Sequence, residues 1–227
     1  MATLELAPGV ALLPSRPAHA FNSYLVDDVL VDAGTRHAWR RLSRALAGVR
    51  VTAHAITHAH ADHQGSSAVA CRELGVPFWA PAGEVDAAES GRVLPLGPSN
   101  VVTRWQARHW AGPGHPVARS LREGGALGSF EVLDTPGHSP GHVSLWRERD
   151  RTLVAGDVMF GQHPLTGRAG PREPPRIFTL DPARNRLAIR RLADLRPRLA
   201  CFGHGPVVRD PGVLADLADR CAVPVLA

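Results

Sequence analysis

Residues 57–63 read Thr-His-Ala-His-Ala-Asp-His, so three histidines and one aspartate fall within six consecutive positions of the chain. The apolar run at 53–56 predicts a short buried strand, and residues 64–74 predict a helix. The cluster therefore lies at the carboxyl end of a strand and leads into a helix, which is where α/β proteins usually place their sites. This order of elements predicts an α/β fold with a functional site at that strand end.

The side chains of this cluster have the chemistry of metal ligands. Neutral imidazole and carboxylate together hold zinc, iron or manganese. His58 and His60 alternate along an extended segment and can point the same way, whereas Asp62 and His63 follow in the turn and can serve a second ion. A lone histidine at a helix start would be interpreted as a cap or a solvated side chain. Four ligand-type residues at this spacing favour a metal site instead.

The bulk composition excludes several other classes. At 227 residues the chain can form one sizeable core, and no segment is long and apolar enough to span a membrane. All 26 basic residues behind the net charge of +5 are arginines spread along the chain, so a solvated surface is favoured over nucleic-acid binding. Without lysine, Schiff-base chemistry and a lysine-dependent phosphate loop are excluded.

Cysteine usage and the first residues predict a cytoplasmic protein. Residues 1–8 lack a basic start followed by an apolar stretch, so no signal peptide is expected. Cys71, Cys201 and Cys221 are scattered, odd in number and without metal-ligand spacing. They fit a reducing compartment, and we interpret all three as buried small apolar residues.

The remaining elements are read from apolar runs and their glycine and proline boundaries. Strands are predicted at 10–13, 22–26, 29–31, 76–80, 129–133, 143–146, 152–155 and 199–202, and helices at 36–47, 182–195 and 213–219. Residues 81–125 carry many Gly, Pro and Arg residues and are predicted to form a partly irregular excursion over the site. Because its apolar content is thin, we assign 1–227 to a single domain.

Three later positions carry ligand-type side chains directly after predicted strands or in their connections. His138 lies in Asp134-Thr-Pro-Gly-His, Asp157 in Val154-Ala-Gly-Asp, and His204 in Cys201-Phe-Gly-His. Small neighbours let the backbone approach an ion closely. Each could be a turn residue by itself, but their occurrence after the dense cluster predicts that they complete one site.

This arrangement resembles the metallo-β-lactamase superfamily. The similarity runs through Asn22-Ser-Tyr-Leu-Val26, Val31-Asp-Ala-Gly34, the 57–63 cluster, His138, Asp157 and His204. It implies a four-layer αββα sandwich, with two mixed sheets packed together, helices outside, and two ions at one edge between the sheets. Zinc is the metal we expect, with iron or manganese as alternatives.

The resemblance also assigns roles to individual residues. The implied ligands are His58, His60 and His138 for the first ion, Asp62, His63 and His204 for the second, and Asp157 as a bridge. Asp32 matches the family's buried acid near the site and is predicted to orient a ligand. His142 and His54 are interpreted as packed structural residues.

The reaction implied by the resemblance is hydrolysis. A water between two cations loses a proton near neutral pH, and the hydroxide attacks the carbonyl carbon of an ester, thioester or lactone. Asp62 and Asp157 are the predicted catalytic side chains, because both can steer or relay the proton. A mononuclear iron persulfide dioxygenase shares these histidines and stays open as an alternative, as does a non-catalytic metal-binding or sensor protein.

Within the superfamily, Gly156-Asp-Val-Met-Phe160 looks like glyoxalase II and its relatives, which are thioester hydrolases. The glutathione contacts of those enzymes cannot be placed in this chain, so the acyl group and any role of glutathione stay open. We expect a small molecule as the partner, with neither nucleic acid nor a membrane, and leave a homodimer open. Residues 160–175 and the excursion with Trp105 and Trp110 are predicted to form the walls of the substrate pocket. Arg168 is a candidate contact for the substrate.

Overall fold

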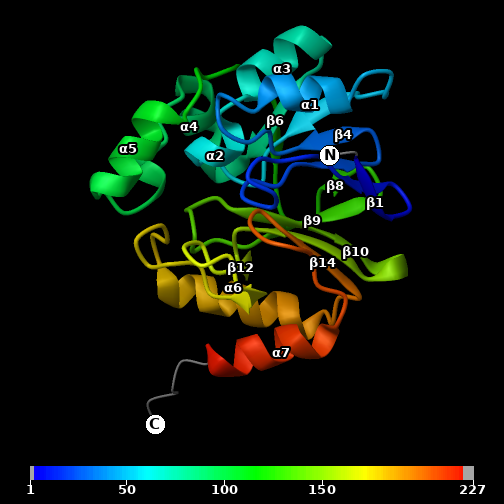
Figure 1. Cartoon of the computed structure of the whole chain (residues 1–227), viewed down its shortest axis with the longest axis vertical. Helices are drawn as coiled ribbons and strands as arrows, with labels where there is room; N and C mark the ends of the chain where they lie inside the picture. The colour runs from blue at the N-terminus through cyan, green and yellow to red at the C-terminus, as the bar shows by residue number, and fades with distance from the viewer. Residues whose placement is uncertain (1–2, 222–227) are drawn as a thin grey trace.

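The computed structural model describes residues 3–221 and consists of two sheets packed face to face, with helices over both outer faces (Figure 1). Helices α1 (Trp39–Ala45) and α3 (Ser67–Leu74) cover one sheet. Helices α6 (Pro182–Asp194) and α7 (Pro211–Arg220) cover the other. The predicted four-layer αββα sandwich is therefore confirmed.

The first sheet has seven strands in the order β1-β2-β3-β4-β5-β6-β7. They are β1 (Leu4–Ala7), β2 (Val10–Leu12), β3 (Tyr24–Val26), β4 (Val29–Val31), β5 (Ala53–Ala55), β6 (Phe78–Pro81) and β7 (Val117–Leu121). Strands β1 to β4 run antiparallel, and β4 to β7 run parallel. Strands β4 to β7 therefore all end at the same edge of the sheet, because parallel neighbours are joined by crossover connections.

The second sheet has five strands in the order β14-β11-β10-β9-β8. They are β8 (Ala126–Leu127), β9 (Phe130–Asp134), β10 (Val143–Arg147), β11 (Thr152–Gly156) and β14 (Leu199–Phe202). The β11–β14 pair is parallel because α6 crosses over between the two strands. Asp181 caps α6 at its amino end, with Pro182 following, and Asp210 and Pro211 do the same for α7.

Three interfaces hold the layers together. Between the sheets, apolar side chains such as Val26, Val31, Val132 and Leu145 form one buried cluster. The second sheet packs on α6 and α7 through a further cluster, and the first sheet packs on its own helices. Within residues 3–221, no helix combines the length and apolar character needed to cross a membrane.

Several sequence predictions need correction. The helix expected at 64–74 is two helices, α2 (Ala61–Gln64) and α3, which separate at Gly65 and Ser66. A Cβ on Gly65 would meet the backbone nitrogen of Arg36 and the backbone oxygen of Trp110 at 2.4 Å each. The chain turns here because the backbones of Gly65, Arg36 and Trp110 lie against one another. Local sequence does not predict such a contact.

The 81–125 excursion is ordered, contrary to prediction. It contains η1 (Ala82–Glu84), α4 (Val85–Ser90), η2 (Leu94–Leu96), α5 (Val101–His109) and β7. Asn100 starts α5 by accepting hydrogen bonds from the backbone of Val102 and Thr103, and Thr103 accepts one from Asn100 in return. Residues 160–175 likewise contain a hairpin, β12 (Phe160–Gln162) with β13 (Ala169–Arg172). Strand β1 was not predicted.

The cysteine prediction holds for two of the three residues. Cys71 and Cys201 are buried, whereas Cys221, just beyond α7, is partly exposed. It packs against the edge of the apolar cluster between the second sheet and helices α6 and α7. None of the three is in a disulfide. His54 is fully buried, with its ring between the Leu30 carbonyl and the Ser67 hydroxyl, so it is the core histidine that we predicted.

Candidate metal centre

The seven predicted ligands arrive at one edge of the sandwich from the carboxyl ends of four strands. The segment after β5 carries the dense cluster, the loop after β9 carries His138, and the ends of β11 and β14 are followed by Asp157 and His204. Of these four strands, β5 belongs to the seven-stranded sheet, and β9, β11 and β14 belong to the five-stranded sheet. Positions up to 146 residues apart in sequence, 58 to 204, become neighbours there.

These residues form overlapping groups whose candidate ligand atoms lie within 4.8 Å of one another. The groups are His58, His60 and His138; His58, His63 and Asp157; and Asp62, His63 and His204. In the first group, the Nδ1 atom of His60 lies 3.1 Å from Nε2 of His58 and 3.0 Å from Nε2 of His138. In the last, Oδ2 of Asp62 lies 3.4 Å from Nε2 of His204. The structure thus brings all seven predicted ligands together.

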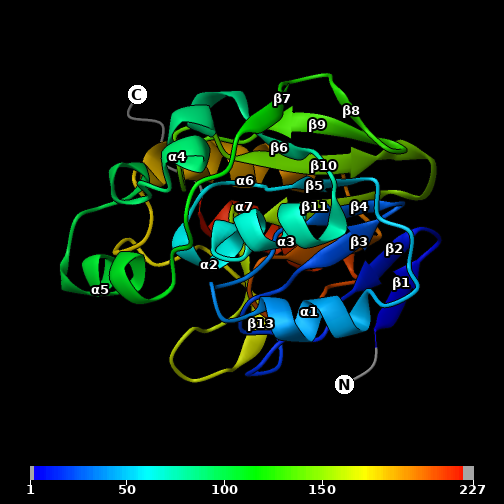
Figure 2. The same cartoon turned by 90° about the horizontal axis from the view of Figure 1, so that it is seen from above.

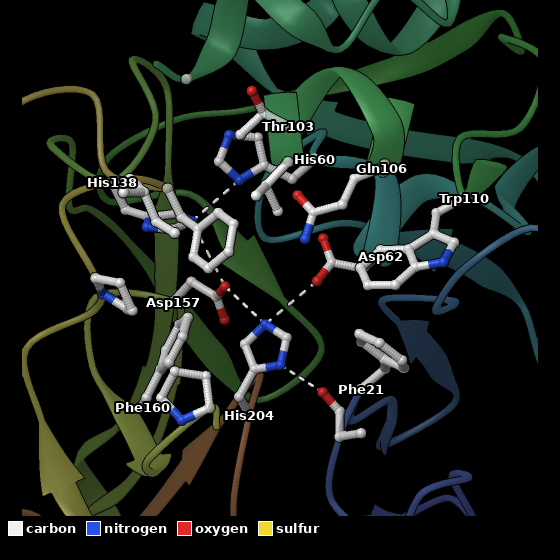
Figure 3. A pocket seen from close by; sticks show the side chains of 18 of the residues that line it. Phe21, His60, Asp62, Thr103, Gln106, Trp110, His138, Asp157, Phe160 and His204 are labelled. Carbon is white, nitrogen blue, oxygen red and sulfur yellow. Dashed lines mark hydrogen bonds and ion pairs between the residues drawn. The ribbon is translucent and has the colours of Figure 1, made fainter. Parts of the chain in front are cut away.

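Asp157 occupies the centre of the arrangement. Its Oδ2 atom lies 3.1 Å from Nε2 of His204, 3.4 Å from that of His63, 3.5 Å from that of His138 and 3.9 Å from that of His58. Figure 3 shows the carboxylate between His138 and His204 at the base of the cavity. One oxygen therefore reaches histidines of both predicted ion sites, which is the position that a bridging ligand needs.

Each ligand histidine is held at the ring nitrogen that points away from the cluster. The partners are the Thr57 hydroxyl for His58 (3.1 Å), the Leu96 carbonyl for His60 (3.3 Å), Asp32 for His63 (2.9 Å), the Thr179 hydroxyl for His138 (3.4 Å) and the Ala20 carbonyl for His204. An outer nitrogen that donates its hydrogen leaves the inner nitrogen with a lone pair aimed at the cluster. This is the tautomer that metal binding requires.

Asp32 supports one histidine from each predicted ion site. Its buried carboxylate accepts hydrogen bonds from the Nδ1–H of His63 (2.9 Å), the Thr57 backbone (2.8 Å) and the Thr57 hydroxyl (2.9 Å). That hydroxyl in turn faces Nδ1 of His58. Asp32 therefore acts on ring orientation, at the position where we predicted an orienting acid.

The electrostatics of the cluster fit divalent cations. Burial and neighbouring histidines hold the pKa values of His58 and His138 well below the usual range, so both rings are neutral. Burial works against the charge on Asp157, but His204 and His63 outweigh it and hold the carboxyl pKa well below its usual range. Burial lowers the pKa of His204, but Asp157 and Asp62 raise it to about 10. A metal ion bound at the ring nitrogen of His204 that faces the cluster would replace the proton there.

Two buried atoms give an independent test of the fit. Among the described residues, six buried side-chain nitrogen or oxygen atoms lack a hydrogen-bond partner, and two of them, Nε2 of His63 and Oδ1 of Asp157, belong to predicted ligands. Buried polar atoms without partners are rare and costly in native proteins. Both belong to the groups that the ligand spacing identifies, so the donor set fits a metal site.

The surrounding backbone is shaped to let Asp157 reach the cluster. A Cβ on Gly203 would lie 2.0 Å from Oδ1 of Asp157, and one on Gly156 would lie 2.6 Å from Nε2 of His142, so only glycine fits at either position. His142 accepts a hydrogen bond from the backbone nitrogen of Asp157 (3.0 Å) and contacts the Thr135 hydroxyl. It is outside the ligand groups and holds the end of β11 in place, consistent with the predicted packing role.

Glu84 is a supporting residue that the sequence analysis missed. Its side chain is buried and accepts hydrogen bonds from the backbone nitrogen of Ala59 (2.6 Å), the backbone nitrogen of Gly141 (2.9 Å) and the hydroxyl of Ser139. The carboxylate therefore connects the loop that carries His58 and His60 to the loop that carries His138. A lone glutamate in a segment interpreted as irregular gave no signal of this role.

A cavity of about 840 Å³ opens directly above the cluster (Figure 3). Asp62 and His204 are the more accessible ligands, with 15% and 14% of their side chains exposed, and both face this space. Residues of 160–175 line it, as predicted, and so does Trp110. Trp105 is not among the lining residues and packs against Trp110 instead.

The weak prediction for Arg168 is not supported by its position. This residue is exposed near the tip of the β12–β13 hairpin and is not among the residues that line the cavity. Arg172, at the end of β13, lines the cavity instead.

The fold, the ligand set and the cavity define an enzyme of the metal-dependent hydrolase class. Residues 18–204 match the family model described as the metallo-beta-lactamase superfamily, and the chain belongs to that superfamily. It is 28% identical over 233 residues to YflN of Bacillus subtilis (strain 168), described as a probable metallo-hydrolase, with 91% of this chain and 83% of YflN covered.

Two further similarities bear on the reaction and the metal. A hydroxyacylglutathione hydrolase of Methylobacillus flagellatus is 30% identical over 136 residues, which cover 59% of this chain and 43% of that enzyme. The solved structure of TTHA1623 in a di-iron-bound form superposes with a TM-score of 0.63 at 27% identity, covering 96% of this chain and 98% of the other.

Proposed function

We propose that this enzyme is a dinuclear metal-dependent hydrolase that cleaves an ester, thioester or lactone at its carbonyl group. The observation that carries the proposal is the position of Oδ2 of Asp157 between the histidines of two ligand groups. A ligand shared in this way supports two ions close together, and both ion sites retain a full set of protein ligands. A sequence relationship to hydroxyacylglutathione hydrolases over part of the chain supports carbonyl hydrolysis as the chemistry.

When bound, two divalent ions supply a water of lowered pKa and a Lewis acid for the carbonyl oxygen. In the reaction, the oxygen of water bonds to the carbonyl carbon and the acyl–oxygen or acyl–sulfur bond breaks. The leaving alcohol or thiol takes a proton, and the acid retains the oxygen of the water. Asp62 is placed to steer that proton, because its carboxylate faces both the cavity and His204.

The remaining residues hold the ligands still while the cavity positions the substrate. Asp32, Thr57 and Thr179 fix the ring orientations through hydrogen bonds, so the chain does not have to reorganise as charge develops. Zinc is the metal that we propose, with iron as the alternative that the di-iron relative supports. We also propose a cytoplasmic location and a small-molecule substrate, consistent with the free cysteines and the enclosed cavity.

Metal stoichiometry combined with oxygen dependence tests this proposal. The purified protein, reconstituted with zinc, should bind two ions per chain and hydrolyse ester or thioester substrates under anaerobic conditions. Asp62→Ala should reduce the stoichiometry towards one ion, since its site would keep only His63, His204 and the shared Asp157. A single bound iron with stoichiometric oxygen uptake would replace the hydrolase by the persulfide dioxygenase alternative.

A further inference from the structure

We propose that the cavity above the metal centre binds the hydrocarbon chain of a neutral acyl group, so that the preferred esters or thioesters carry an apolar acyl chain. The inference rests on the proposed hydrolase function and adds the class of acyl group to it. It is carried by the apolar side chains that line the cavity and by the small number of charged groups among them outside the ligand cluster.

One wall comes from helix α5, which lies at one end of the molecule beyond the sheets (Figure 1 and Figure 2). Its lining residues are Val102, Thr103, Gln106 and Ala107, with Trp110 directly after the helix. These positions fall on one helical face. No residue of α5 is buried, and Val102 remains 44% exposed. The apolar part of this face therefore packs against no core and is available to a ligand.

Further apolar side chains complete the lining. They belong to Phe21, Phe160, Pro164, Leu165, Ile177 and Phe178. Leu165 and Ile177 are 90% and 51% exposed, and both are large apolar residues at the entrance. Isolated exposed apolar residues need no explanation, but a set that surrounds one cavity marks a binding site.

The charged groups of the wall are already engaged with the protein. Arg172 is the only arginine among the described lining residues, and it donates to the carbonyl oxygens of Gly170 (3.2 Å) and Arg168 (3.1 Å). Glu173 accepts from Nε of Arg186 at 2.9 Å. Hydrogen bonds to carbonyl oxygens do not neutralise the guanidinium charge of Arg172. However, most of the remaining wall is apolar, and an anionic acyl group would lose its hydration against these side chains, so the lining favours a neutral one.

His163 is the lining histidine outside the ligand cluster, and its Nδ1 atom accepts hydrogen bonds from the backbone nitrogens of Leu165 and Thr166 at 3.2 Å each. The cavity is polar at the ligand cluster, whereas most of its other lining residues, on α5 and around it, are apolar. This difference orients a substrate with its carbonyl at the metals and its chain along α5.

A homologous series of nitrophenyl esters tests the proposal on the zinc-loaded enzyme. From acetyl through butanoyl and hexanoyl to octanoyl, kcat/KM should rise by up to about fourfold per methylene, which corresponds to ~0.8 kcal/mol. Nitrophenyl hemisuccinate replaces the terminal methyl of the butanoyl ester by a carboxylate and should be the poorer substrate of that pair. A flat series, or a preference for the hemisuccinate or for a glutathione thioester, would overturn the proposal.

Two neighbouring valines of α5 provide a matched pair of variants. Val102 lines the cavity, whereas Val101 is 74% exposed and is not among the lining residues. Val102→Asp should lower kcat/KM for the octanoyl ester about tenfold more than for the acetyl ester, because it places a charge beside the chain. Val101→Asp should leave the whole series unchanged. Equal changes of kcat/KM in the two variants would contradict the assignment of Val102 to the wall of the acyl-binding cavity.

Calorimetric binding of butanone, hexanone and octanone separates this inference from the proposed reaction, since these ketones cannot be hydrolysed. Affinity should increase with chain length and should fall in Val102→Asp but not in Val101→Asp. Chain-length-dependent ketone binding without ester hydrolysis would support the cavity inference and reject the hydrolase. Hydrolysis without chain-length dependence in either assay would support the hydrolase and reject the cavity inference.

Discussion

In the ligand cluster every histidine ring is held at its outer nitrogen, whereas helix α5, which forms part of the wall facing it, has no buried residue along its length. The first region lies at the ends of central strands and is held by hydrogen bonds to neighbouring segments. The second lies on a peripheral helix and a hairpin. The two regions enclose the same cavity, but only the ligand cluster is positioned by the ends of the sandwich's strands.

This difference implies that metal binding and substrate preference can change independently. Substitutions in the cluster should alter metal content and turnover for every substrate alike, because each ligand serves the reacting centre. Substitutions in the wall should alter the ranking of substrates without altering metal content, since specificity commonly lies in irregular or peripheral segments carried by a rigid scaffold. The following predictions test that separation.

The largest effect is expected for Asp157→Asn. Asparagine keeps the shape of the side chain but removes the charge from the atom that lies between four imidazole nitrogens. Metal affinity and kcat/KM should fall by more than about 100-fold, beyond the range usual for residues that only orient ligands. Metal analysis and kinetics check this, and retention of both ions with full turnover would contradict the bridging role.

Asp32→Asn should have the next largest effect. It removes the charged acceptor of His63 and weakens the support of His58 through Thr57, which should lower metal affinity and turnover by about 10- to 100-fold. Asp27→Asn is a matched control, because Asp27 and Asp32 have similar positive φ angles, 52° and 57°, that asparagine tolerates. Equal loss of metal in both variants would show that a general loss of stability, not ligand orientation, is responsible.

Glu84→Gln should act on the cluster from a greater distance. A glutamine presents one acceptor oxygen to three donors, so a buried donor loses its partner at a cost of about 2 kcal/mol. The melting temperature should fall by roughly 4–8 °C, and metal affinity should fall with it. Glu89→Gln is the control, since Glu89 accepts from the Val117 backbone, away from the ligand loops. An unchanged metal affinity in Glu84→Gln would limit Glu84 to a stabilising role.

The smallest effect is expected for Arg168→Ala. This exposed arginine lies outside the cavity lining, so kcat/KM should change by less than about twofold for any substrate, the size usual for surface substitutions. A raised KM for an anionic substrate alone would restore the predicted contact and bring the tip of the hairpin into the binding site.

Local patterns predicted most strands of the two sheets and, with the family resemblance, the ligands. They also indicated which segments line the cavity, but not the secondary structure of those segments. Runs such as 29–31 and 199–202 are short and continuously apolar, and both are strands because they are buried on both faces. In contrast, α5 buries no residue, and the many Gly, Pro and Arg residues of the surrounding segment led to its interpretation as partly irregular. Its start depends on the Asn100 capping box, a signal of a few residues.

The amino-acid sequence alone determined the αββα architecture, the seven ligands and the orienting acid. Residue types at positions after strands indicated the metal chemistry, and the family resemblance indicated the architecture and the role of each residue. Only the tertiary structure decided how these groups are supported and what faces them. Glu84 joins two ligand loops because η1 folds against both, and Arg172 lines the cavity whereas Arg168, directly before the same strand, does not. Such contacts join residues distant in sequence, and packing, not local propensity, sets the distances between them.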